Sequence, residues 1–104
     1  MDRAVFVYTT WPTTVEAEAA GRTLVERRLA ACVNILGPCR SIYRWQGVIE
    51  EATEVPAIFK TTSAQMEKLV ASIAAAHSYE VPAIVAWPIE TADKRYREWI
   101  EQSP

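Results

Sequence analysis

The chain has 104 residues, of which 50% are hydrophobic and 23% are charged. This length corresponds to a single domain spanning residues 1–104, and this composition excludes an intrinsically disordered chain. The formal net charge is −2 and no basic stripe is present, so no nucleic-acid partner is expected. The sequence has neither an apolar run of about 18 residues nor a secretory signal pattern. No membrane partner and a cytoplasmic location are therefore expected.

The distribution of apolar residues predicts strands that alternate with helices. Runs rich in β-branched and aromatic residues, bounded by turn residues, predict strands. These runs are residues 3–11, 32–36 continued by 40–46, 55–62 and 81–89. Apolar residues at helical spacing predict helices within residues 13–33, 63–77 and 91–102. Gly47 is expected in a turn, and residues 48–54 are expected to be a connection.

Four residues refine these elements. Thr13 followed by Glu16 is the signature of a capping box, in which side chains satisfy free N–H groups at a helix start. Ser63 is the expected cap of the second helix. Gly21 costs about 1 kcal/mol relative to Ala inside a helix, so it is expected to approach a strand closely. Pro56 cannot donate a ladder hydrogen bond and is expected at the start or edge of a strand.

The element order β-α-β-β-α-β followed by a helix predicts the fold class. Two right-handed split βαβ crossovers give an antiparallel sheet with both helices on one face, which is the α+β ferredoxin-like sandwich. The expected strands carry apolar residues on both faces, and four Trp and four Tyr are many for a small core. A second cover for the sheet is needed, and we expect oligomerisation to supply it.

His77 is the only histidine, and it is expected to end the second helix, where the helix dipole favours imidazolium. Three interpretations stay open. The ring packs and forms hydrogen bonds, or it ligates a metal, or it acts in acid–base catalysis. A metal site needs three or four donors, so Glu80, Tyr79 or another subunit would have to contribute. No nucleophile or metalloprotease motif occurs, and an enzyme is not expected.

Other polar and aromatic residues have two readings each. Tyr43, Trp45, Tyr96 and Trp99 are expected to be packing or interface residues rather than a cofactor box. Lys60 stands at a strand end before a helix start, where it is either solvated or part of an anion site. Glu80 is either a surface carboxylate or the neighbour of Lys60 or Arg44 from another subunit.

Five blocks in order along the chain resemble the CutA divalent-cation-tolerance family. They are "LAACVNI" (29–35), "SIYRWQGVIEE" (41–51), "IFKTT" (58–62), "H-x-YEVP" (77–82) and "Y-x-x-WI" (96–100). The resemblance implies a ferredoxin-like protomer in a tight homotrimer, similar in architecture to the trimeric PII signalling proteins. It also implies an association with tolerance to copper and other divalent metals, and some members of the family bind copper.

The chain departs from the family pattern at three positions. Ser78 stands where members usually have proline. Thr9 and Ala76 stand where some relatives have a cysteine and a second histidine, which are ligands suited to copper. A copper site copied from such relatives would retain only His77.

Two functional hypotheses result. The first is a non-enzymatic, cytoplasmic, homotrimeric divalent-cation tolerance protein that requires no cofactor. Its hypothetical ligand is Cu²⁺ or another divalent metal, held weakly by His77 with Glu80 as a second donor. The alternative is a PII-like regulatory module that binds a small anionic ligand or a partner protein in an intersubunit cleft. The residues assigned to that cleft are Lys60, Tyr79, Tyr43, Trp45, Tyr96 and Trp99.

Overall fold

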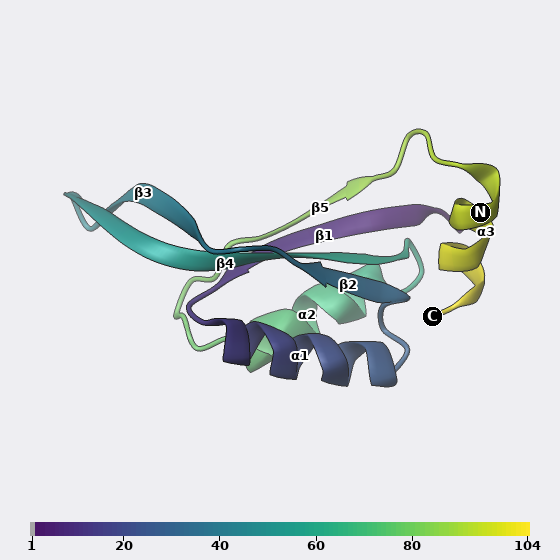
Figure 1. Ribbon diagram of the computed structural model, residues 1–104, viewed down its shortest axis with the longest axis horizontal. Helices are drawn as coiled ribbons and strands as arrows, with labels where there is room; N and C mark the ends of the chain where they lie inside the picture. Colours follow the sequence, from purple (N-terminus) through teal and green to yellow (C-terminus); the bar gives the residue numbers. More distant parts are fainter. Residues whose placement is uncertain (1) are drawn as a thin grey trace.

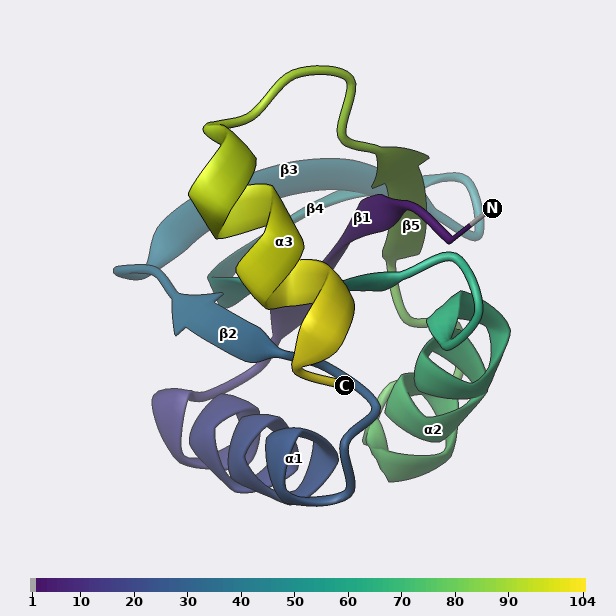
Figure 2. The ribbon, with the colours of Figure 1, turned by 90° about the vertical axis from the view of Figure 1, so that its right-hand side faces the viewer.

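The predicted pattern of strands and helices produces an antiparallel sheet with two helices on one face and a third helix at one end (Figure 1). The computed structural model describes residues 2–104. Its elements are β1 (Ala4–Trp11), α1 (Thr14–Glu26), β2 (Cys32–Ile35), β3 (Cys39–Trp45), β4 (Val48–Thr62), α2 (Met66–Ala76), β5 (Ile84–Pro88) and α3 (Lys94–Gln102). The strand order is β2-β4-β1-β5, with β3 also paired to β4. Because α1 and α2 share one face of the sheet (Figure 2), this is the predicted ferredoxin-like fold with an extra C-terminal helix.

The core lies between the sheet and these two helices. Val7 and Trp11 on β1, Phe59 on β4, and Leu69 and Ile73 on α2 are all fully buried. Their spacing follows the strand period of two and the helical period, so the predicted apolar faces are the ones that pack. α1 also packs on β2, where a Cβ added to Gly21 would lie 3.0 Å from Cγ1 of Val33. The predicted close approach at Gly21 is therefore confirmed.

The expected connection at residues 48–54 is instead the first part of β4. This 15-residue strand pairs with β3 from Cys39↔Glu54 to Trp45↔Val48. Gln46 and Gly47 have φ of 50° and 81°, as in a two-residue hairpin turn whose backbone twist matches the paired strands. Pairing with β3 overrides the weak strand propensity of the glutamates in this segment. The expectation of a connection was wrong because the strand propensity of residues 48–54 alone does not include the stabilisation by pairing with β3.

Pro56 lies in the middle of β4, so its predicted place at a strand start or edge is wrong. On the side that faces β1, Pro56 pairs with Thr10. On the other side, its carbonyl accepts a hydrogen bond from Leu36 N at 2.9 Å, between the end of β2 and the start of β3. The nitrogen and carbonyl of one strand residue point to the same side, so the proline nitrogen faces this break between strands. No ladder hydrogen bond is lost there.

The helix boundaries also differ from expectation. α1 ends at Glu26 rather than near residue 33, and Arg28 adopts a left-handed φ of 62° just beyond it. A left-handed residue commonly ends a helix, but usually as glycine, so the sequence carries no signal for it here. The N-cap of α2 is Gln65, not Ser63. The Ser63 hydroxyl instead donates to the Asp2 carboxylate at 2.9 Å.

The predicted cap of α1 forms in part. The Thr13 hydroxyl accepts a hydrogen bond from Glu16 N at 3.1 Å. The Glu16 side chain accepts bonds from the backbone N–H and the hydroxyl of Ser78, at 3.0 and 3.1 Å. Ser78 therefore ties the segment after α2 to the start of α1.

The β3–β4 hairpin projects beyond the helices (Figure 1). It carries exposed apolar side chains. Ile42, Val48 and Ile49 are 68%, 59% and 57% exposed. The strand expected over residues 81–89 begins only at Ile84, and exposed Val81 precedes it. Among residues 2–104, no helix combines the length and apolar character needed to cross a bilayer.

Candidate functional site

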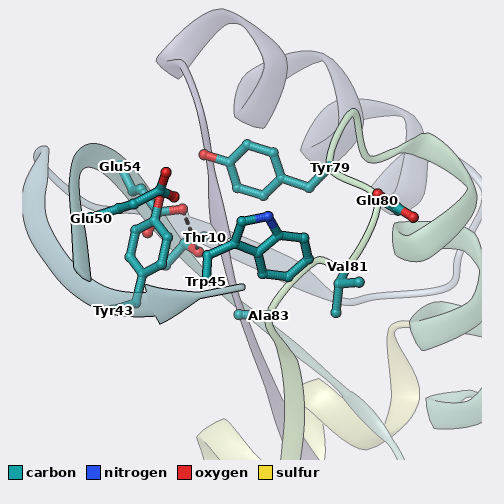
Figure 3. A pocket seen from close by; sticks show the side chains of 9 residues that line it. All are labelled: Thr10, Tyr43, Trp45, Glu50, Glu54, Tyr79, Glu80, Val81 and Ala83. Atoms are coloured by element: carbon teal, nitrogen blue, oxygen red, sulfur yellow. Dashed lines mark hydrogen bonds between the residues drawn. The ribbon is translucent and has the colours of Figure 1, made fainter. Parts of the chain in front are cut away.

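A pocket of about 290 Å³ lies where the β3–β4 hairpin leaves the sheet and the segment after α2 passes over it (Figure 3). It is lined by aromatic rings, carboxylates and small side chains. The lining residues are Thr10, Tyr43, Trp45, Glu50, Glu54, Tyr79, Glu80, Val81 and Ala83.

Strand periodicity brings the hairpin residues to this pocket. Tyr43 and Trp45 are two residues apart on β3, so their side chains point to one face. On β4, Glu50 and Glu54 are four apart and share a face in the same way. Tyr43 stands opposite Glu50 in the register. The hairpin therefore presents two rings and two carboxylates together, and Tyr79 covers them from the segment after α2 (Figure 3).

Glu54 is the most buried acid of the pocket, at 8% exposure. One of its carboxylate oxygens accepts a hydrogen bond from the Thr10 hydroxyl at 3.1 Å. Within residues 2–104, the ion pairs involve Glu51, Glu98 and Asp93 and leave Glu54 without a basic partner. Carboxylates buried to this degree are usually paired with a cation, and Glu54 has no such partner among residues 2–104.

The two phenols of the pocket are held in the neutral form. Burial, followed by the adjoining Glu54 carboxylate, raises the pKa of Tyr79 to about 12. Loss of solvent, followed by the charges of Glu50 and Glu54, raises the pKa of Tyr43. Both hydroxyls therefore keep their protons at neutral pH and can donate hydrogen bonds within the pocket.

His77 lies directly behind the pocket wall and is buried. Its Nδ1 accepts a hydrogen bond from Tyr79 N at 3.1 Å, so the ring proton is on Nε2, which donates to the Thr10 carbonyl at 2.6 Å. The ring stacks on Trp11 with centroids 4.3 Å apart. This is the packing and hydrogen-bonding role among the three interpretations. His77 positions Tyr79 over the pocket.

These bonds bear on the hypothesis of a metal held by His77 and Glu80. A nitrogen that accepts or donates a hydrogen bond has no free lone pair for a metal. No group of three or more His, Cys, Asp or Glu side chains that could hold a metal occurs among residues 2–104. Copper binding at His77 and Glu80 stays a prediction, and it requires at least one ring nitrogen to give up its hydrogen bond.

The six residues assigned to one cleft lie in two places. Tyr43, Trp45 and Tyr79 line the pocket, whereas Lys60, Tyr96 and Trp99 lie at the opposite end of the molecule, beside α3 (Figure 1). Within one chain these six residues do not share a cleft, because β4 is long enough to place Lys60 far from the hairpin. The intersubunit cleft stays a prediction.

At the α3 end, the ammonium group of Lys60 is engaged within the chain. It donates to the Tyr96 hydroxyl at 2.9 Å and lies 5.6 Å from the Phe6 ring centroid. Tyr96 and Trp99 stack with centroids 5.8 Å apart. These contacts dock α3 on the face of the sheet opposite α1 and α2. Lys60 was expected to be either solvated or part of an anion site. Neither expectation included this packing role.

Sequence reasoning missed Thr10, Glu50 and Glu54 as pocket residues. The two glutamates were assigned to a connection, which hid their shared face. The signal was available in the Gln46-Gly47 turn, because a two-residue turn after the strand of Tyr43 places Glu50 directly across from it.

The fold and the pocket define a ferredoxin-like α+β protein with an acidic, aromatic pocket at the root of a projecting hairpin. The sequence profile of the family described as "CutA1 divalent ion tolerance protein" matches residues 5–103. The chain therefore belongs to the CutA1 divalent ion tolerance protein family.

Individual relatives agree with this assignment over nearly their full length. A divalent-cation tolerance protein CutA of Archaeoglobus fulgidus is 43% identical over 98 residues, covering 94% of this chain and 95% of that protein. The one of Thermus thermophilus is 42% identical over 103 residues, covering 99% and 98%. A solved structure, described as the periplasmic CutA of Archaeoglobus fulgidus, superposes with a TM-score of 0.89 at 43% identity and covers 93% of this chain and 94% of its own.

Proposed function

We propose that this protein acts in tolerance to divalent cations, as a homotrimer and without catalysis. The observation that carries the proposal is the family match over residues 5–103, together with relatives above 40% identity that are named for this function. The exposed apolar side chains of the β3–β4 hairpin support the trimer, because apolar surface of this kind marks interfaces. A cytoplasmic location stays a prediction.

Copper sensitivity of cells tests the role in tolerance. Deletion of the gene should lower the Cu²⁺ concentration that stops growth, and the wild-type chain should restore it. The matched variant is His77→Ala. If the role depends on the arrangement of the segment around Tyr79, or on copper at His77, this variant restores growth less well. Unchanged copper sensitivity in the deletion strain would contradict the proposal.

Calorimetric titration with Cu²⁺ separates direct binding from an indirect role. If His77 is a ligand, the wild type releases binding heat that His77→Ala lacks. Circular dichroism of both proteins shows whether the variant remains folded. Equal, negligible heats for both would refute the direct site at His77 and Glu80 and leave only an indirect role.

The pocket does not favour the small anionic ligand that the PII-like alternative requires. Glu50, Glu54 and Glu80 line the pocket, and three carboxylates disfavour a small anion there. Regulation through a partner protein stays open to the same growth assay, since a partner would act without binding copper.

A further inference from the structure

The pocket at the root of the hairpin combines three features that together suit one class of ligand. Its walls carry the rings of Tyr43, Trp45 and Tyr79. Its inner end carries Glu54, which is only 8% exposed. Glu54 forms no ion pair with a basic side chain within residues 2–104. Glu50 adds a second carboxylate on the same strand face, opposite Tyr43.

Aromatic rings attract a cation through their negative faces, and this attraction is largest where water is excluded. Trp45 and Tyr43 are each 40% exposed, so their rings form an open wall, and Tyr79 lies across from them (Figure 3). A ligand between these rings would touch π-faces on several sides. A carboxylate behind the rings then supplies the charge that compensates an ammonium group.

Two observations distinguish an organic cation from a metal ion. The carboxylates do not converge, since no group of three potential metal ligands occurs in the described part of the chain. Figure 3 shows Glu80 apart from Glu50 and Glu54, with the Trp45 ring between them. The volume of about 290 Å³ is also far above what a bare ion needs, and it is at the lower end of the roughly 300–1,000 Å³ of small-molecule pockets.

We infer that this pocket binds a small organic ammonium ion, with the rings of Trp45, Tyr43 and Tyr79 around the cation and Glu54 as its counter-charge. The assignment goes beyond metal tolerance and does not rest on it. The deletion strain can show unchanged copper sensitivity while the protein binds an ammonium ion. Copper sensitivity can equally change while no ammonium ion binds.

The test uses tetramethylammonium as the probe and tert-butyl alcohol as a neutral molecule of similar shape. Titrations followed by NMR monitor the indole N–H of Trp45 and the backbone amide of Tyr79, at constant ionic strength. We expect saturable shifts with tetramethylammonium, with a Kd of about 1 mM or tighter. We expect tert-butyl alcohol to bind at least about tenfold more weakly, because it lacks the charge.

Two acid variants test the counter-charge. Glu54→Gln should weaken tetramethylammonium binding at least about tenfold, because the amide removes the negative charge that attracts the cation. Its control is Glu51→Gln, which removes the same charge from the same strand. Glu51 lies outside the pocket, where it pairs with Arg40 at 3.0 Å, so its variant should bind like the wild type. Circular dichroism confirms that each variant is folded.

A ring variant keeps the test decisive if Glu54→Gln does not fold. Trp45 is on the projecting hairpin and half-exposed, so Trp45→Ala should remain folded and should lose the shifts at Tyr79 N. Absence of saturable shifts in the wild type, equal affinity for the neutral alcohol, or equal effects of the two acid variants would each overturn the inference. So would a structure of the oligomer in which a lysine or arginine of another subunit fills the pocket.

Discussion

At the residue scale, His77 and Tyr79 act as one unit. The imidazole uses one nitrogen to hold the backbone of Tyr79 and the other to hold the Thr10 carbonyl. The Tyr79 ring then lies 4.8 Å from the histidine ring and reaches over the pocket. His77 therefore supports the wall of the pocket through Tyr79.

The raised pKa of Tyr79 gives a pH prediction. Its ordinary pKa is 10.0 and its pKa in the fold is about 12, so the fold favours the neutral phenol. The stabilisation is complete below pH 10 and is lost as the pH rises from 10 towards 12, because the unfolded chain then ionises first. We expect the free energy of unfolding to fall over this range in the wild type and to fall less in Tyr79→Phe.

Ultraviolet absorbance of the phenolates measures the same property directly. Tyr79→Phe should remove the component that titrates near pH 12. Circular dichroism at each pH confirms that the chain is folded. A component near pH 12 that persists in folded Tyr79→Phe would contradict the assignment.

At the element scale, the β3–β4 hairpin depends on its turn. Gln46 and Gly47 both have positive φ, and only glycine adopts a φ of 81° without cost. The turn sets the register that places Tyr43 opposite Glu50. A change in the turn therefore acts on stability and on the pocket together.

We expect Gly47→Ala to lower the free energy of unfolding by about 1 kcal/mol, because the added Cβ disfavours a left-handed residue. Denaturant unfolding at one protein concentration measures the loss. The matched control is Gly37→Ala, since Gly37 has open space around it and no positive φ. Equal stability of the two variants would show that the turn does not need glycine.

At the scale of the whole molecule, the apolar surface is unevenly distributed. The hairpin exposes Ile42, Val48 and Ile49, and β5 exposes Val85 and Trp87. The helical face is different, since α1 and α2 bury their apolar stripes against the sheet. The exposed apolar surface is therefore on the parts that project or lie at a sheet edge, where a neighbouring subunit can cover it.

Light scattering at low micromolar concentration tests the trimer. The wild type should have three times the mass of the 11.7 kDa chain. Ile49→Glu should reduce that mass, because burying an unpaired carboxylate in an interface is costly. Val15→Glu is the control, since Val15 is 79% exposed on α1, away from the hairpin. A wild-type mass of one chain would refute the trimer.

Much of the fold could be predicted from the sequence, because strand and helix periods act within a few residues. The errors fell where distant segments decide. Pro56 is tolerated in mid-strand only because the chain passes from β2 to β3 beside it. Residues 48–54 are a strand only because β3 pairs with them. Neither neighbour is visible in the local sequence.

By itself, the sequence determined the alternation of strands and helices, their apolar faces and the family, since these depend on local periodicity and on ordered blocks of residues. It did not separate β2 from β3, which were expected as one continued strand. Only the tertiary structure decided the site. Glu54 meets Thr10 across 44 residues and His77 meets Thr10 across 67. Such contacts depend on strand register and on the path of the chain after α2. For that reason, only the tertiary structure shows that His77 holds the backbone of Tyr79 and that Glu50 and Glu54, which were expected in a connection, line the pocket.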